Sequence, residues 1–161
     1  MTTTSIPETT CIEKCRVCKC DLFTELYSVG DLYISNFPDK ADDGIKAPLE
    51  MVMCNKCKLV QLRHSAPQEL LYSRFYWYRS GVTDTMRKAL RNITESIEDR
   101  MDLREGDVVL DIGSNDGTML RTYEVPGIIT VGVEPASNLA EEGEKELDYF
   151  INDFWEADSY W

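Results

Sequence analysis

The chain has 161 residues, which is enough for one domain or two small ones, and its 43% hydrophobic content is sufficient for a core. The formal net charge of −12 counts against a broad contact with nucleic-acid phosphates, because such a contact needs a basic surface. The sequence has no apolar run long enough to span a membrane, and its N-terminus lacks the pattern of a secretory signal. We therefore expect a cytoplasmic protein in which residues 1–12 form a flexible tail.

The six cysteines all lie within the first 57 residues. Four of them form two Cys-x-x-Cys pairs, CRVC at 15–18 and CNKC at 54–57. Each pair places two thiolates on one side of a tight turn, and two such turns supply the four soft ligands of a tetrahedral zinc ion. The sequence therefore predicts a zinc-binding domain over residues 13–66. Its predicted ligands are Cys15, Cys18, Cys54 and Cys57.

Other interpretations of the cysteines fit less well. A disulfide framework would suit a secreted domain. A redox Cys-x-x-Cys motif is normally found in a βαβ unit, which this region does not have. Cys11 and Cys20 are spare, and His64 is a further candidate ligand, but four cysteines already fill a zinc site. Because a four-cysteine site has no open position, we expect the metal to stabilise the fold.

Strand-like segments surround the two cysteine pairs. We expect strands at 22–29 and 32–34, a loop at 36–48, and a hairpin whose strands, 49–53 and 59–62, are joined by CNKC.

Residues 67–104 are expected to connect this domain to the next. A short helix is predicted near Pro67, where proline suits the first turn. Five aromatic residues follow within the seven positions 72–78, and they indicate either packing between two domains or a segment that faces a substrate. A helix is predicted from 83 to about 101, because four apolar residues recur at helical spacing and form one stripe that we expect to be core. The stripe consists of Met86, Leu90, Ile93 and Ile97.

The stretch VVLDIGSNDGTML, residues 108–120, reads as a strand, a turn with two glycines and the start of a helix. This is what a nucleotide-binding βα unit needs, although an ordinary tight turn would also use glycines. A second strand at 128–133 ends on Glu134, where an acid can hold the two ribose hydroxyls of a nucleotide. A helix at 136–147 and a third strand at 149–151 follow.

The order of these motifs resembles that of the S-adenosylmethionine-dependent sugar C-methyltransferases, which modify nucleotide-linked deoxysugars. The stretches that carry the resemblance are CRVC, PLEMVMCNKCKLVQL, YWYRSG, DIGSNDGTML and VGVEP. The resemblance implies an α/β fold in which a small four-cysteine zinc domain precedes the first half of a Rossmann-like methyltransferase domain, here residues 105–161. It also implies that the substrate is a nucleotide sugar and that the cofactor is S-adenosylmethionine.

The resemblance further implies roles for individual residues. Tyr76 and Tyr78 match a tyrosine-bearing segment close to substrate and cofactor, and they are the candidate catalytic residues. The glycine loop would hold the methionine part of the cofactor, Glu134 the ribose, and Asp153 with Phe154 the adenine. The candidate cofactor-binding residues are Asp111, Gly113, Asn115, Gly117, Glu134, Asp153 and Phe154.

Residues 105–161 supply only three predicted strands of a methyltransferase core. We therefore expect an N-terminal portion of such an enzyme that is inactive alone and could associate with itself through its incomplete sheet. Two alternatives stay open. One is a zinc-ribbon module that binds other proteins, and the other is a methyltransferase with a different acceptor.

Overall fold

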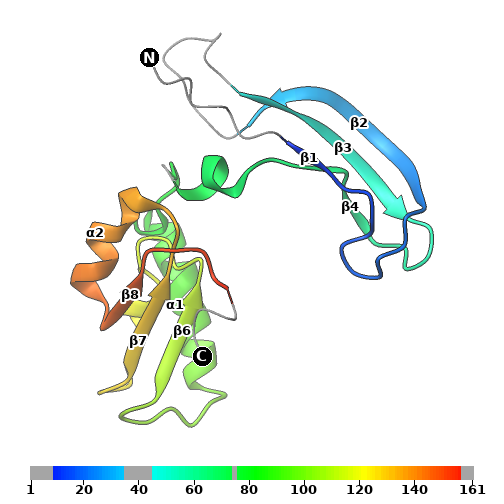
Figure 1. The fold of residues 1–161 in the computed structure, drawn as a ribbon. Helices are drawn as coiled ribbons and strands as arrows, with labels where there is room; N and C mark the ends of the chain where they lie inside the picture. Colours follow the sequence, from blue (N-terminus) through cyan, green and yellow to red (C-terminus); the bar gives the residue numbers. More distant parts are fainter. Residues whose placement is uncertain (1–8, 35–44, 74–75, 157–161) are drawn as a thin grey trace, which may run out of the picture. The chain divides into compact units, whose positions relative to one another are not determined.

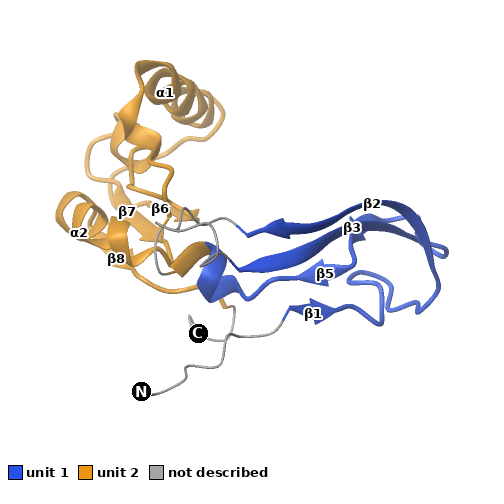
Figure 2. Cartoon of the chain, turned by 90° about the horizontal axis from the view of Figure 1, so that it is seen from above, with its two compact units in different colours: residues 1–71 blue, residues 72–161 orange. Residues whose placement is uncertain are grey.

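The computed structural model describes residues 9–34, 45–73 and 76–156. The chain divides into two compact units, Met1–Leu71 (unit 1) and Tyr72–Trp161 (unit 2), which Figure 2 colours separately. Among the helices within the described ranges, none combines the length and apolar character that crossing a membrane requires.

Unit 1 is built from antiparallel strands. Three of them, β2 (Phe23–Tyr33), β3 (Lys46–Cys54) and β4 (Val60–Leu62), form a sheet in the order β2-β3-β4 (Figure 1). The predicted hairpin closed by CNKC is confirmed by the pairing of β3 with β4. The two strands predicted at 22–29 and 32–34 are instead one strand, β2, because the chain passes through Gly30 with a φ of +83° and a register shift without leaving the ladder.

A second, two-stranded sheet pairs β1 (Thr10–Cys11) with β5 (His64–Ser65). Thr10 and Cys11 thus belong to a strand and not to the predicted flexible tail, whose residues 1–8 lie outside the described residues. Residues 35–44, which include most of the predicted loop, also lie outside them.

The core of unit 1 is very small. Cys15, Val52 and Cys54 are its buried residues within the described part. Almost every side chain of β2 is exposed. A domain of this size with so little buried apolar surface needs an additional constraint, which the cysteine cluster provides.

Unit 2 begins with helical segments. The predicted helix near Pro67 is reduced to one helical turn at Glu69–Ser73, which crosses the boundary between the units, and a second short turn covers Ser80–Val82. The long helix α1 runs over Asp84–Glu98, and the Thr83 side chain caps it by accepting a hydrogen bond from the Met86 amide.

The expectation that the apolar stripe of α1 is core is only partly correct. Ile93 is 47% exposed and the other stripe residues are half-buried. Thr94 is the buried residue of α1, and its Oγ1 lies 2.9 Å from Oγ1 of Thr122. The buried residue of α1, Thr94, is therefore one position after Ile93 of the predicted stripe.

The predicted strands of the C-terminal part form a parallel sheet. Its members are β6 (Val108–Ile112), β7 (Ile129–Val133) and β8 (Tyr149–Ile151), in the order β6-β7-β8 (Figure 1). Val108, Leu110 and Ile112 share one face of β6 and are exposed. This sheet confirms the α/β character of the C-terminal part. The predicted self-association through the sheet stays a prediction.

The helix predicted to start near Thr118 does not form. The structure has a single turn there, Leu120–Thr122. The Thr122 amide donates to the Met119 carbonyl at 3.0 Å, the backbone is already extended at Tyr123 with a ψ of 138°, and Pro126 has no amide hydrogen to continue a helical ladder.

The helix after β7 is formed as predicted, as α2 (Ser137–Glu146). Leu139 and Gly143 are its buried residues, and Gly143 packs directly against Phe150 of β8. This packing fixes the position of α2 against β8.

Candidate metal centre and candidate cofactor site

The two Cys-x-x-Cys turns have the same backbone geometry. In each, the residue after the second cysteine, Lys19 or Lys58, donates its amide to the carbonyl of the first cysteine at 3.0 Å. Both lysines have φ values near +60°, which turns the chain back. The amides of Cys15 and Cys54 then each bond a carbonyl five residues ahead, at 2.8 and 2.9 Å. Two matching turns therefore face one another.

The structure brings the four predicted zinc ligands together. Their Sγ atoms all lie within 4.8 Å of one another, with Cys15–Cys57 at 3.6 Å and Cys18–Cys54 at 3.4 Å. A zinc ion with Zn–S bonds of ~2.3 Å in a tetrahedron separates its sulfurs by about 3.8 Å. The donor set and its spacing therefore support zinc.

The pKa values of the thiols show that four adjacent thiolates need a compensating positive charge. The pKa of Cys15 is lowered to about 6, chiefly by a hydrogen bond from the Cys18 backbone, which outweighs burial. The Leu59 backbone lowers the pKa of Cys57, but burial and the three neighbouring cysteines oppose a further negative charge and raise it to about 12. A bound dication supplies the positive charge that four adjacent thiolates require.

Gln61 links the first cysteine turn to the following strands. Its Nε2 donates to Cys15 Sγ at 3.3 Å, and its Oε1 accepts from the Arg16 amide at 3.2 Å. The Arg16 guanidinium donates in turn to the Leu62 carbonyl at 2.6 Å and to the Ser65 hydroxyl at 2.7 Å. The sequence does not indicate this role of Gln61, because Gln61 looks like any other polar residue in a strand.

Cys11, Cys20 and His64 lie outside the cysteine cluster. His64 belongs to β5, and its Nδ1 is 3.6 Å from a Glu50 carboxylate oxygen. It also lines a cavity of about 530 Å³ within unit 1, whose walls contain no cysteine.

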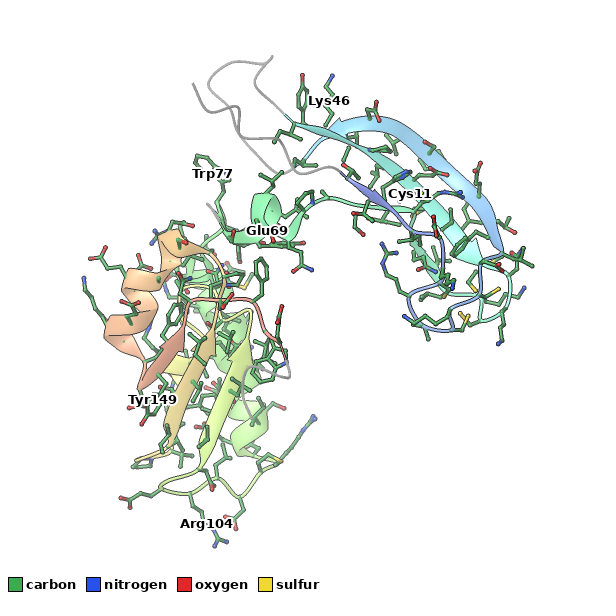
Figure 3. The ribbon with its side chains drawn as sticks, viewed as in Figure 1. Cys11, Lys46, Glu69, Trp77, Arg104 and Tyr149 are labelled. Atoms are coloured by element: carbon green, nitrogen blue, oxygen red, sulfur yellow. The ribbon has the colours of Figure 1, made fainter. Side chains whose placement is uncertain are left out.

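The candidate cofactor residues meet at one edge of the parallel sheet. Because β6, β7 and β8 run in the same direction, the glycine loop after β6, Glu134 after β7 and Asp153 after β8 follow the same edge. Figure 3 shows Arg104, which precedes β6, and Trp77, in the aromatic segment, at opposite ends of unit 2.

The glycine loop is fixed over the end of β7. The amides of Gly113 and Ser114 both donate to the Val133 carbonyl, at 2.8 and 3.1 Å. Gly113, Asn115 and Gly117 all have positive φ. A Cβ on Gly117 would lie 3.1 Å from Leu147, whereas the space beside Gly113 is open. Gly117 thus serves tight packing, and Gly113 is the position where the backbone can be approached.

Glu134 is anchored by both carboxylate oxygens. It is 6% exposed, and it accepts from the Asn115 amide at 3.0 Å and from the Ala136 amide at 2.9 Å. Each oxygen keeps a further lone pair for a ligand hydroxyl. The pKa of Asp111 is raised, first by burial and then by the charge of Glu134, so a second carboxyl group lies close to the same edge.

The remaining predicted site residues differ in their surroundings. The Asn115 side chain bonds the backbone of Tyr78 and Ser80. Tyr76 is half-buried with its ring 6.2 Å from that of Tyr72, and Tyr78 is exposed. Asp153 is exposed and accepts from the amide of the half-buried Phe154 at 2.7 Å. The roles assigned to these residues stay predictions.

The chain is similar to a known domain family and to a curated protein. Residues 15–72 match the family model described as "Putative zinc binding domain". The C-methyltransferase NovU of Streptomyces niveus is 32% identical over 133 residues, which are 80% of this chain and 31% of that relative. The chain therefore spans about a third of the length of the curated relative that it matches. The predicted resemblance to C-methyltransferases is confirmed as a similarity to one.

Proposed function

We propose that the chain forms the structural zinc site and part of the S-adenosylmethionine site of a C-methyltransferase. The premise is its similarity to a C-methyltransferase and its match to a zinc-binding domain family. The observation that carries this proposal is the carboxyl edge of the parallel sheet. A glycine loop, a buried glutamate and an aspartate follow three adjacent strands there.

The chemistry of this edge suits an S-adenosyl ligand. Glu134 is held rigidly, and its free lone pairs accept hydrogen bonds from a ribose diol. The charge of Glu134 contributes to the raised pKa of Asp111, so the two carboxyl groups together favour a cation such as the sulfonium group of S-adenosylmethionine. When bound, this cofactor supplies the methyl group for transfer.

The strand order and the position of Glu134 after the second strand also support a Rossmann-like sheet, of which β6, β7 and β8 are the first three strands. We further propose a nucleotide-linked ketodeoxysugar as the acceptor, with Tyr76 and Tyr78 facing it. This step rests on the resemblance of the YWYRSG stretch.

A titration tests the cofactor site. S-adenosylhomocysteine, added to the zinc-loaded chain in a calorimeter, is expected to bind and to slow amide hydrogen exchange at residues 113–118. Asp153→Ala removes an exposed carboxylate without disturbing the core, and Glu134→Gln removes the ribose acceptor. Both are expected to weaken binding about tenfold or more, because a charged hydrogen bond contributes ~1.5–3 kcal/mol.

Glu144→Gln is the matched control, because Glu144 is exposed on α2, and it should leave the affinity unchanged. A folded, zinc-loaded chain that shows no heat and no change in exchange at millimolar ligand would overturn the proposal.

A further inference from the structure

The YWYRSG segment, residues 76–81, is attached to the glycine loop through its backbone. The Ser80 amide donates to Asn115 Oδ1 at 2.9 Å, and Asn115 Nδ2 donates to the Tyr78 carbonyl at 3.0 Å. The Gly81 amide donates to Asp116 Oδ2 at 2.8 Å. The side chains of two adjacent loop residues thus hold the backbone of the segment, so the attachment does not depend on the segment's own side chains.

Asp116 is a rigid anchor. It is 3% exposed, and its second carboxylate oxygen accepts from the Thr118 amide at 3.1 Å. Gly81 fits against it only because it lacks a side chain. A Cβ on Gly81 would lie 2.6 Å from Thr118 Oγ1 and 3.0 Å from Asp116 Oδ2. The close approach of the Gly81 backbone to the side chains of Asp116 and Thr118 therefore favours glycine at this position.

The other end of the segment is attached to α2. The Tyr76 amide donates to Asn138 Oδ1 at 2.9 Å, and Asn138 Nδ2 donates to the Tyr76 carbonyl at 3.1 Å. The Arg79 guanidinium donates to the Asn138 carbonyl at 3.2 Å and forms an ion pair with Glu142. The segment thus joins the loop after β6 to the helix after β7.

These contacts reach the candidate cofactor site through Asn115. Its side chain holds the YWYRSG segment, while its amide donates to Glu134 at 3.0 Å. A ligand that restrains Glu134 and the glycine loop therefore also restrains the residue that anchors the segment. By linkage, an ordered segment favours the ligand to the same extent.

We propose that Asn115, Asp116 and Asn138 are positioning residues, which hold the YWYRSG segment across the carboxyl edge so that segment ordering and S-adenosyl ligand binding stabilise one another. The coupling rests on the proposed function, whereas the attachment of the segment does not. None of the three residues needs to take part in methyl transfer for this role.

Amide hydrogen exchange on the zinc-loaded chain tests the attachment. The variant is Asn115→Gly, because Asn115 has a φ of +55° and glycine removes the side chain without straining this backbone. We expect the Ser80 amide to exchange at least tenfold faster, while amides within β6 and β7 stay unchanged. Asn115→Asp keeps the acceptor for the Ser80 amide and should restore its protection. Asn92→Ala, at an exposed position of α1, is the control.

The coupling is tested by the same variant with S-adenosylhomocysteine. In the unaltered chain the ligand should further protect the Ser80 amide, and Asn115→Gly should raise the dissociation constant about 5- to 150-fold. Asn138→Ala releases the Tyr76 end alone, at a residue of α2 outside the glycine loop, and should weaken binding in the same direction. It also serves if Asn115→Gly does not fold.

The positioning role and the coupling are contradicted by different results. Unchanged Ser80 exchange in folded Asn115→Gly overturns the positioning role. Unchanged affinity, despite faster Ser80 exchange, overturns the coupling. If the unaltered chain binds no S-adenosylhomocysteine, the proposed function and the coupling fail together, and the positioning role is still decided by the Ser80 amide.

Discussion

Gln61 donates a hydrogen bond from Nε2 to the Sγ atom of Cys15 at 3.3 Å. This contact joins a β4 side chain to a zinc-ligand candidate in a turn more than forty residues earlier in the chain. A donor at a thiolate stabilises its negative charge, and this hydrogen bond contributes to lowering the pKa of Cys15. Residues that orient metal ligands in this way also influence metal affinity.

We expect Gln61→Ala to weaken zinc binding by about 10- to 100-fold, the usual range for losing such a supporting contact. Competition with a chromogenic chelator measures this loss. Gln68→Ala changes an exposed glutamine outside the cluster and is the control. Equal zinc affinity in the two variants would show that the Gln61 contact has no role in metal binding.

Removal of zinc is expected to unfold unit 1, because the three buried residues in its described part are too few to hold its sheet. Amide exchange with a strong chelator should show loss of protection in β2, β3 and β4, and retained protection in β6 and β7. Cys54→Ser should have the effect of the chelator, whereas Cys11→Ser, outside the cluster, should still bind one zinc per chain. A protected β3 in the metal-free chain would contradict the prediction.

The sequence predicted those parts of the fold that local chemistry determines. The two cysteine pairs required similar turns, and the strands predicted before the glycine loop and at 128–133 formed as β6 and β7. The helix predicted after the glycine loop does not form, because the backbone is extended at Tyr123 and Pro126 cannot continue a helical ladder. The attachment of Tyr78 and Ser80 to Asn115 joins residues more than 30 positions apart, so no local pattern indicated it.

Gly143→Ala should destabilise the protein. Within an exposed helix this change would stabilise by about 0.8–1 kcal/mol, since alanine is the better helix former. Here a Cβ would lie 2.2 Å from Phe150 Cδ2, so α2 must move off β8. We expect a net loss of about 1–3 kcal/mol in the free energy of unfolding, measured in urea. Adding Phe150→Val should recover part of it, and a stabilised single variant would show that α2 and β8 do not pack in this way.

Asp111→Asn should stabilise the protein at neutral pH. Burial, together with the charge of Glu134, raises the pKa of Asp111, so the fold disfavours its ionised form. A carboxyl group whose pKa is raised by folding stabilises the fold fully at a pH below its ordinary pKa, here 3.8. This stabilisation is lost as the pH rises through the pKa of the folded state. The gain from the variant should therefore be largest at pH 7 and should vanish as the pH falls below about 3.8.

Asp148→Asn is the matched comparison with the opposite sign. Hydrogen bonds from the backbone and hydroxyl of Thr130 lower the pKa of Asp148, so its ionised form stabilises the fold. Its contribution is present above pH 3.8 and is lost as the pH falls through the lower folded-state value. Urea midpoints measured from pH 7 down to pH 3 should therefore show Asp111→Asn above the unaltered chain and Asp148→Asn below it at neutral pH, with both differences shrinking in acid. Two variants displaced in the same direction at pH 7 would contradict the assignment of one of the two carboxyl environments.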